Sequence, residues 1–460
     1  MSDTANTRPL SNAVYAAYGT GWIGGQVFRD VPALILLSFM ITAIGVPPAV
    51  AGAAIFIPKL WIVFCDPLMG LWSDRTKSRW GRRRPFLFVG SILCGITFNL
   101  LFNIPHFDSG TAKGIYVGLI YTVASIAFSI YSVPYLTMAS ELSTNMHERT
   151  IVMSWRQVGL GFGLIASNVM PTLLIVQGGG GEAGHQFMAI VLGLICGVTM
   201  FVTFIGTRSV PLIESDQPAV RLIDQMCLAA KNRPFLILLG SNFAQLVGSA
   251  ASYATIILFT VYNLKKEITF VSLMTLLMAI MVILTPPVWT ALSRCIGKKP
   301  TFILSIICFF LSFLAFAWVE PGDDITLYVI SLCIGTFNCG FSLMAFSMLL
   351  DTIAYDRKIS GLNREGVFSG IWSAMDKTAF AFGALLAGLG LSYFGFQESA
   401  GGFVAQSPET IRGIMITYIG APTIFAALSF VIMLGYQLNE HDLAESVEPR
   451  PLPTGRPIAS

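Results

Sequence analysis

The sequence predicts an all-α membrane protein with about twelve transmembrane helices arranged in two six-helix halves. Hydrophobic residues make up 54% of the chain and charged residues only 12%, whereas a soluble domain has roughly 25% charged residues. The apolar residues form runs of about the 20 residues that a helix needs to cross a bilayer. A long polar segment at 208–234 lies midway and separates six runs from six.

Hydropathy gives the position of each run and the organisation of the chain. The apolar runs are 14–45, 48–72, 86–105, 114–139, 151–176, 187–207, 235–262, 268–292, 300–319, 325–350, 367–395 and 411–437. The predicted parts are an N-terminal tail at 1–13, a six-helix bundle at 14–207, a linker at 208–234, a second bundle at 235–437 and a Pro-rich, disordered tail at 438–460.

The positive residues are sorted by loop. Of the 28 Lys and Arg residues, 21 fall on the side that the two termini share, four fall on the other side, and three lie within or beside apolar runs. Because cytoplasmic loops carry the excess of Lys and Arg, both termini are expected in the cytoplasm. Residues 1–13 contain no apolar core of the signal-peptide type, so the first helix is expected to direct insertion into the bacterial inner membrane.

Asp66 is a carboxylate within the apolar segment LWIVFCDP. An ionisable group at bilayer depth costs a few kcal/mol or more, so such residues usually line a path for ions, protons or substrate. A basic loop follows directly, and the alternative interpretation is that Asp66 pairs with this loop at the helix end. Asp74 is nearer to that loop in sequence, which favours an intramembrane role for Asp66.

The first helix carries the segment YGTGWIGGQVFRDVP, in which four glycines form a small face for close helix packing. Gln26 lies one turn from both Arg29 and Asp30, and Pro32 loosens the helix just beyond them. Two interpretations remain open. Gln26 and Arg29 either present donors to a carboxylate or phosphate in a cavity, or Arg29 and Asp30 pair with neighbouring helices and bind no ligand.

Three motifs carry a family resemblance. DPxxGxxSDRTxSRWGRRRP follows the second run, VPYxxMAxEL ends the fourth (133–142), and SGxxREG (360–366) precedes a run with an embedded lysine. Together with the layout of twelve helices, they resemble the glycoside–pentoside–hexuronide:cation symporters, the melibiose-permease-like branch of the major facilitator superfamily. The resemblance implies alternating access, with substrate between the two halves.

The resemblance also implies roles for individual residues. Asp66 matches a cation-site aspartate, and Ser129 matches a hydroxyl ligand of the same site. Arg156 is similar to an arginine near the sugar, while Ser373 and Lys377 are similar to a hydroxyl and a lysine of the eleventh helix. With no cofactor or metal implied, the coupling ion is expected to be H⁺ or Na⁺.

Four positions depart from the family pattern. The family's first cation-site aspartate, one turn before Asp66, is Ile62 here, the intervening amide is Cys65, and the two sugar-binding aspartates are Gln26 and Ser132. Na⁺ needs several oxygen ligands, which this face of the helix does not supply, whereas a single carboxylate can carry a proton. Proton coupling is therefore predicted over sodium coupling.

Charged residues near the ends of the helices form a second candidate set. They resemble the cytoplasmic networks that hold one end of such transporters closed, although solvated loop charge is the plainer interpretation. The set comprises Asp74, Arg75, Arg79, Arg83, Asp351, Arg364 and Glu365.

The resulting prediction is a secondary transporter and not an enzyme, because the chain has no Walker A phosphate loop or other nucleotide-binding motif. The first hypothesis is a proton symporter that imports a sugar, a glycoside or a sugar acid. The alternative is a carrier or exporter of a lipid, steroid or other amphiphile, since loss of the sugar-binding aspartates makes the cavity less polar. The expected partners are a small-molecule substrate and the bilayer, with no nucleic acid and a monomeric chain.

Overall fold

A computed structural model describes residues 10–142, 146–208, 210, 232–319, 322–360 and 365–438. Most of the predicted linker and most of both predicted tails lie outside the described residues. Some side chains within the helices, including those of Asp74 and Glu365, are also not described. All regular elements in the described residues are helices.

The first half contains six helical segments. They are α1 (Asn12–Val31) with its π-helical continuation η1 (Pro32–Leu36) and η2 (Phe39–Ala43), α2 (Pro48–Arg75), α3 (Arg84–Phe102), α4 (Gly110–Glu141), α5 (Met146–Gln177) and α6 (Gly181–Thr207). The change from α- to π-helix begins at Pro32, which has no N–H to donate to the ladder. The predicted loosening of the first helix beyond Asp30 is thus present.

The second half contains the remaining segments. They are α8 (Arg233–Leu258) with η3 (Phe259–Asn263), α9 (Thr269–Leu284), α10 (Pro286–Ile296), α11 (Lys298–Ala315) with η4 (Phe316–Trp318), α12 (Asp324–Ser360), α13 (Glu365–Tyr393), α14 (Pro408–Met415), η5 (Ile416–Gly420) and α15 (Ala421–Leu434).

The predicted number of membrane helices is confirmed. Ten helices in the described residues are long and apolar enough to cross a membrane, and the bent pair α9 and α10 raises the number to eleven. Residues 12–43, which include Arg29 and Asp30, form a further helical segment made of α1, η1 and η2.

Two predicted boundaries were wrong. The run at 268–292 is not one straight helix, because it bends by 51° at the break before Pro286. The run expected to end at residue 350 continues as helix to Ser360. Asp351 therefore lies on α12 rather than in a loop, because tertiary packing extends the helix beyond its apolar stretch.

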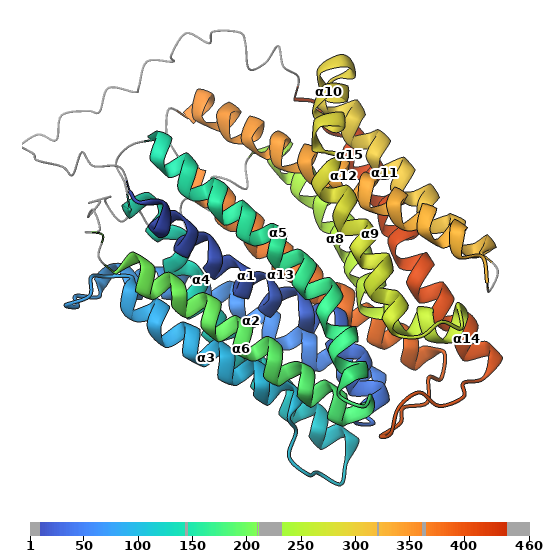
Figure 1. Cartoon of the computed structure of the whole chain (residues 1–460). Coiled ribbons are helices and arrows are strands. Elements are labelled where there is room, and N and C mark those ends of the chain that lie inside the picture. Colours follow the sequence, from blue (N-terminus) through green and yellow to red (C-terminus); the bar gives the residue numbers. More distant parts are fainter. Residues whose placement is uncertain are drawn as a thin grey trace, which may run out of the picture.

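The helices form two groups, with α1–α6 in blue to green on one side of Figure 1 and α8–α12 with α15 in lime to red on the other. Within the first group α1 packs on α5 and α6, and within the second α8 packs on α13 and α15. The groups meet where α2 packs on α13, α5 on α9, and η1 on α8. Residues on these facing helices are the ones that can line a path between the halves.

Several hydrogen bonds join the halves at the end opposite the termini. Ser399 and Gly402, in the loop after α13, donate their backbone N–H groups to the carbonyl oxygens of Ile41 (3.0 Å) and Thr42 (2.9 Å). Both acceptors lie in η2, where π-helical turns alter the ordinary backbone pairing. On the facing pair α5 and α9, Thr275 Oγ1 donates to the carbonyl oxygen of Asn168 over 3.1 Å. These contacts hold the two groups together at this end.

The glycine face of α1 allows its close packing on α5 and α6. A Cβ on Gly19 would overlap the backbone of Trp155, and a Cβ on Gly159 of α5 would overlap the carbonyl of Gly19. Gly21 and Gly24 similarly approach α6, whereas Gly25 has only its own neighbour Trp22 nearby. Three of the four predicted glycines therefore serve helix packing.

This packing gives a first prediction. Gly159→Val should destabilise the purified protein by about 1–3 kcal/mol or more, since the added side chain must displace backbone rather than a flexible side chain. Gly161→Val, on the same helix with open space around the position, is the matched control. Thermal unfolding in detergent measures both variants, and equal midpoints would contradict the close approach of α1 and α5.

Candidate transport site

Asp66 of α2 lies where the two halves meet. One oxygen, Oδ1, accepts a hydrogen bond from Ser129 Oγ of α4 over 2.5 Å. The other oxygen forms an ion pair with Lys377 Nζ of α13. Each of the two charged side chains retains 25% exposure. The structure therefore brings together the three residues predicted for ion coupling, and Lys377 turns inward rather than extending to the membrane surface.

The contacts of Asp66 offer few oxygen ligands to a metal cation. Its two partners are one hydroxyl and one ammonium group, and the neighbouring positions on α2 hold Ile62 and Cys65. A hard cation takes several oxygen ligands, and the recorded contacts of Asp66 supply the oxygens of one carboxylate and one hydroxyl.

A second charged group forms around Asp30 on α1. Its carboxylate accepts hydrogen bonds from Gln26 Nε2 (2.6 Å), Arg29 Nε (2.9 Å) and Ser167 Oγ of α5 (3.5 Å). Arg29 uses Nε for this bond, which leaves its Nη groups available to a further acceptor, and its side chain is 58% exposed. Arg29 thus pairs with a residue of its own helix, and only Asp30 reaches a neighbouring helix, through Ser167. Both interpretations of the first helix stay predictions.

Asp376 of α13 is the neighbour of Lys377 in sequence and has its own partner. Its Oδ1 accepts a hydrogen bond from Asn242 Nδ2 of α8 over 3.3 Å. Asp376 is not among the residues predicted from the sequence.

Arg156 of α5 packs its guanidinium over the ring of Trp22, with 4.2 Å from Cζ to the ring centroid. Trp22 in turn stacks on Tyr135 of α4. Three buried polar atoms here lack a hydrogen-bond partner among the described residues: Trp22 Nε1, Gln26 Oε1 and Arg156 Nε. Unpaired buried polar groups are rare and costly, so two donors and an acceptor beside an aromatic ring indicate a place where ligand hydroxyls can bind.

Lys59 of α2 is a further cation that the sequence predictions omit. Its Nζ lies 5.6 Å from the centroid of the Phe380 ring. Lys59 precedes Asp66 by two helical turns, so it lies on the same face of α2. That spacing is the signal in the sequence that identifies it.

Two predicted substrate residues are not joined to the charged groups by a hydrogen bond within the described ranges. Ser132 is 4% exposed on α4, one turn after Ser129. Ser373 is exposed on α13, one turn before Lys377 and therefore on the same face.

The predicted gating set is only partly brought together. Arg83 donates to Glu141 Oε1 (Nε, 3.0 Å) and to Ser73 Oγ (2.5 Å), all within the first half. Asp351 pairs with Lys298 over 2.6 Å within the second half.

Among the described residues, the other members of the predicted gating set have no contact that joins the two halves. Arg79 lies 5.4 Å from the Trp80 ring centroid, and Arg75 ends α2. Arg364 and the side chains of Asp74 and Glu365 lie outside the described residues. Glu141, absent from the predicted set, is the acid of the VPYxxMAxEL segment and the acceptor for Arg83.

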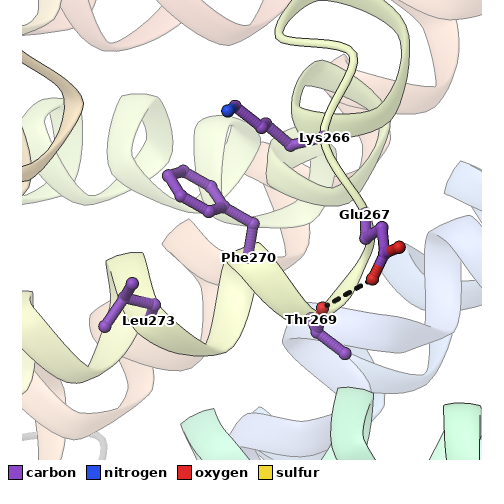
Figure 2. A pocket seen from close by; sticks show the side chains of 5 residues that line it. All are labelled: Lys266, Glu267, Thr269, Phe270 and Leu273. Carbon is purple, nitrogen blue, oxygen red and sulfur yellow. Dashed lines mark hydrogen bonds between the residues drawn. The ribbon is translucent and has the colours of Figure 1, made fainter. Parts of the chain in front are cut away.

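Two surface-accessible pockets lie elsewhere. Figure 2 shows the first, of about 320 Å³, where Glu267 accepts a hydrogen bond from Thr269 at the start of α9 and Phe270 and Leu273 line the wall. The second, of about 160 Å³, lies between the halves beside His185. Neither contains a residue of the predicted transport site.

Comparison with known proteins agrees with this geometry. A family model described as "MFS/sugar transport protein" matches residues 17–440. The isoprimeverose transporter of Lactiplantibacillus pentosus is 23% identical over 415 residues, which cover 88% of this chain and 84% of that protein. The glucuronide carrier protein homolog of Escherichia coli (strain K12) is 25% identical over 441 residues, which cover 95% of each.

Similarity of fold extends to solved structures. This chain is similar in fold to the crystal structure of the nucleoside transporter NupG, with a TM-score of 0.64 and 14% sequence identity. The matched region covers 93% of this chain and 98% of the NupG chain. The family match spans nearly all the helices. The chain therefore belongs to the MFS/sugar transport family and is a membrane-embedded transporter of sugar-type substrates, in agreement with the resemblance carried by its motifs.

Proposed function

We propose that this transporter is a proton symporter that imports an anionic sugar, such as a uronate, across the bacterial inner membrane with both termini in the cytoplasm. The observation that carries the proposal is the joining of Asp66, Ser129 and Lys377 from three helices and both halves. A proton on Asp66 removes the negative charge that holds Lys377. Proton binding is thereby linked to the contact between the halves.

The balance of charge supports an anionic substrate. Helices α1, α2, α5 and α13 carry four cations, Arg29, Lys59, Arg156 and Lys377, and three carboxylates, Asp30, Asp66 and Asp376. Arg29 and Lys377 have carboxylate partners, whereas Arg156 and Lys59 lie against aromatic rings. Partly buried cations that lie against rings rather than carboxylates favour an anionic ligand.

The aromatic and polar groups around Trp22 support a sugar over a lipid or steroid. A sugar hydroxyl can both donate and accept hydrogen bonds. Sugar hydroxyls could therefore accept from Trp22 Nε1 and Arg156 Nε and donate to Gln26 Oε1. An apolar amphiphile would leave these buried atoms unsatisfied at a cost of about 1–3 kcal/mol each. The amphiphile carrier is therefore the weaker of the two hypotheses.

The test of this proposal is uptake of methyl β-glucuronide into liposomes containing the purified protein. An inward pH gradient of about one unit should support roughly tenfold accumulation for each coupled proton, because one proton then supplies about 1.4 kcal/mol. Replacing Na⁺ by K⁺ at constant ionic strength should leave the rate unchanged. A saturable stimulation by Na⁺, or accumulation without response to the pH gradient, would refute proton coupling.

A further inference from the structure

We propose that Asp30 is a positioning residue for sugar recognition, which orients the side-chain amide of Gln26 so that its oxygen Oε1 accepts a hydrogen bond from a substrate hydroxyl. This inference rests on the proposed sugar site beside Trp22. It gives Asp30 a role in specificity that neither the motifs nor the proposed symport assigns to it. The chemical group recognised is a hydroxyl that donates its proton.

The two oxygens of Asp30 have different donors. Gln26 Nε2 donates to Oδ2 over 2.6 Å, and Arg29 Nε donates to Oδ1 over 2.9 Å. Ser167 Oγ of α5 adds a longer bond of 3.5 Å to Oδ2. As the partner of Arg29 in an ion pair, the carboxylate only accepts hydrogen bonds. Asp30 therefore binds the NH₂ group of the Gln26 amide and repels the oxygen of that amide.

The orientation of the Gln26 amide follows from this contact. A side-chain amide carries its oxygen on one side and its NH₂ group on the other. Because Nε2 faces Asp30, Oε1 lies on the opposite side. The stem of Gln26 is also confined, since a Cβ added to Gly163 of α5 would lie only 2.6 Å from Gln26 Cβ. The contacts with Asp30 and with α5 together fix the amide in one orientation.

The oxygen that Asp30 turns away is the one left for the substrate. Gln26 Oε1 is buried and has no hydrogen-bond partner among the described residues, and a buried acceptor without a partner is costly. Trp22 Nε1, one turn earlier on α1, is a buried donor without a partner in the same part of the structure. A hydroxyl accepts from an indole N–H and donates to an amide oxygen, so these two atoms suit a sugar hydroxyl.

Asp30→Asn should reverse the orientation of Gln26. Arg29 Nε is a donor and selects the oxygen of the new amide, which leaves the NH₂ group of that amide facing Gln26. Gln26 then turns Oε1 toward this NH₂ group and presents its own NH₂ group to the substrate. A hydroxyl can still bind there as an acceptor, but its proton is no longer recognised. The variant thus nearly keeps the shape of the side chain and changes which substrate atom is read.

The experiment measures dissociation constants of the purified protein by isothermal titration calorimetry in detergent. The ligands are methyl β-glucuronide, methyl β-glucoside and analogues of both in which each ring hydroxyl is replaced in turn by fluorine. Fluorine cannot donate a hydrogen bond, so one fluorinated position should bind the wild type roughly tenfold more weakly than the parent sugar. We call this loss the fluorine penalty.

The variants assign that penalty to Gln26 and Asp30. Gln26→Leu should bind the parent sugar roughly five- to tenfold more weakly and lose the penalty, because the acceptor is gone. Asp30→Asn should also lose most of the penalty, to below about twofold. An effect of Asp30 on folding alone would not remove a penalty confined to one hydroxyl. Asp323→Asn, at an exposed loop carboxylate, is the matched control and should keep the wild-type penalty.

The possible failures are distinguishable. If the wild type binds neither parent sugar, or if Gln26→Leu keeps both the affinity and the penalty, the proposed sugar site and this inference fall together. If the wild type tolerates fluorine at every position, or if Asp30→Asn keeps the penalty that Gln26→Leu removes, the inference is refuted and the proposed symport stands. Should Asp30→Asn bind no sugar, Asp30→Glu decides, because a retained carboxylate must keep the penalty, and loss of binding or of the penalty in that variant contradicts the inference.

Discussion

Asp66→Asn should reduce pH-driven accumulation of substrate at least tenfold at a gradient of about one unit, because the variant carries one proton fewer per cycle. Asparagine has nearly the shape of a protonated aspartic acid and still accepts a hydrogen bond from Ser129. It cannot hold Lys377 by charge. Exchange of labelled for unlabelled substrate, which needs no net proton movement, should continue.

The comparison of accumulation with exchange separates coupling from folding. A variant that exchanges substrate but does not accumulate it is folded and uncoupled. Asp323→Asn serves as the control for the substitution itself, since that carboxylate is exposed and distant in sequence from the site. Wild-type accumulation by Asp66→Asn would remove Asp66 from the coupling mechanism.

Arg156→Gln should weaken the apparent affinity for methyl β-glucuronide by about ten- to a hundredfold, which corresponds to the 1.5–3 kcal/mol typical of a hydrogen bond to a charged group. The neutral methyl β-glucoside should lose much less, because its ring and hydroxyls still have Trp22 and Gln26. The guanidinium stands over the Trp22 ring with an unpaired Nε, so it is available to an anion without first breaking an ion pair.

The ratio between the two sugars is the measurement that decides this prediction. Arg412→Gln, at an exposed position of α14, controls for loss of one positive charge. A similar loss of affinity for both sugars after Arg156→Gln would assign the arginine to packing against Trp22 and would argue against an anionic substrate.

The positions of the helices could be predicted from the sequence because insertion of a helix into a bilayer depends on its local composition. Twelve runs of apolar residues correspond to twelve helical segments, most with ends displaced by only a few residues. The exceptions follow from interactions beyond the local run. The bend at Pro286 depends on how α9 and α10 pack. The ten additional residues of α12 include four charged ones, so hydropathy alone ends that helix too early.

Local sequence identifies the candidate site residues, but it does not identify which of them contact one another. Asp66 stands out from sequence alone because a carboxylate in an apolar helix is costly, and motif resemblance adds Ser129, Lys377 and Arg156. The contact of Asp66 with Lys377 joins positions 311 residues apart. No local pattern encodes that pairing.

By itself, the sequence determined the membrane class, the number of helices, the two halves and the single intramembrane carboxylate of the second helix, since each follows from the cost of placing polar groups in lipid. Only the tertiary structure decided which charges meet. It paired Asp66 with Lys377, joined Asp376 to Asn242, and set Lys59 and Arg156 against aromatic rings. The physical reason is that an ion pair depends on distances of a few ångströms between helices, and these distances are set by packing features such as the contact of Gly19 with Gly159.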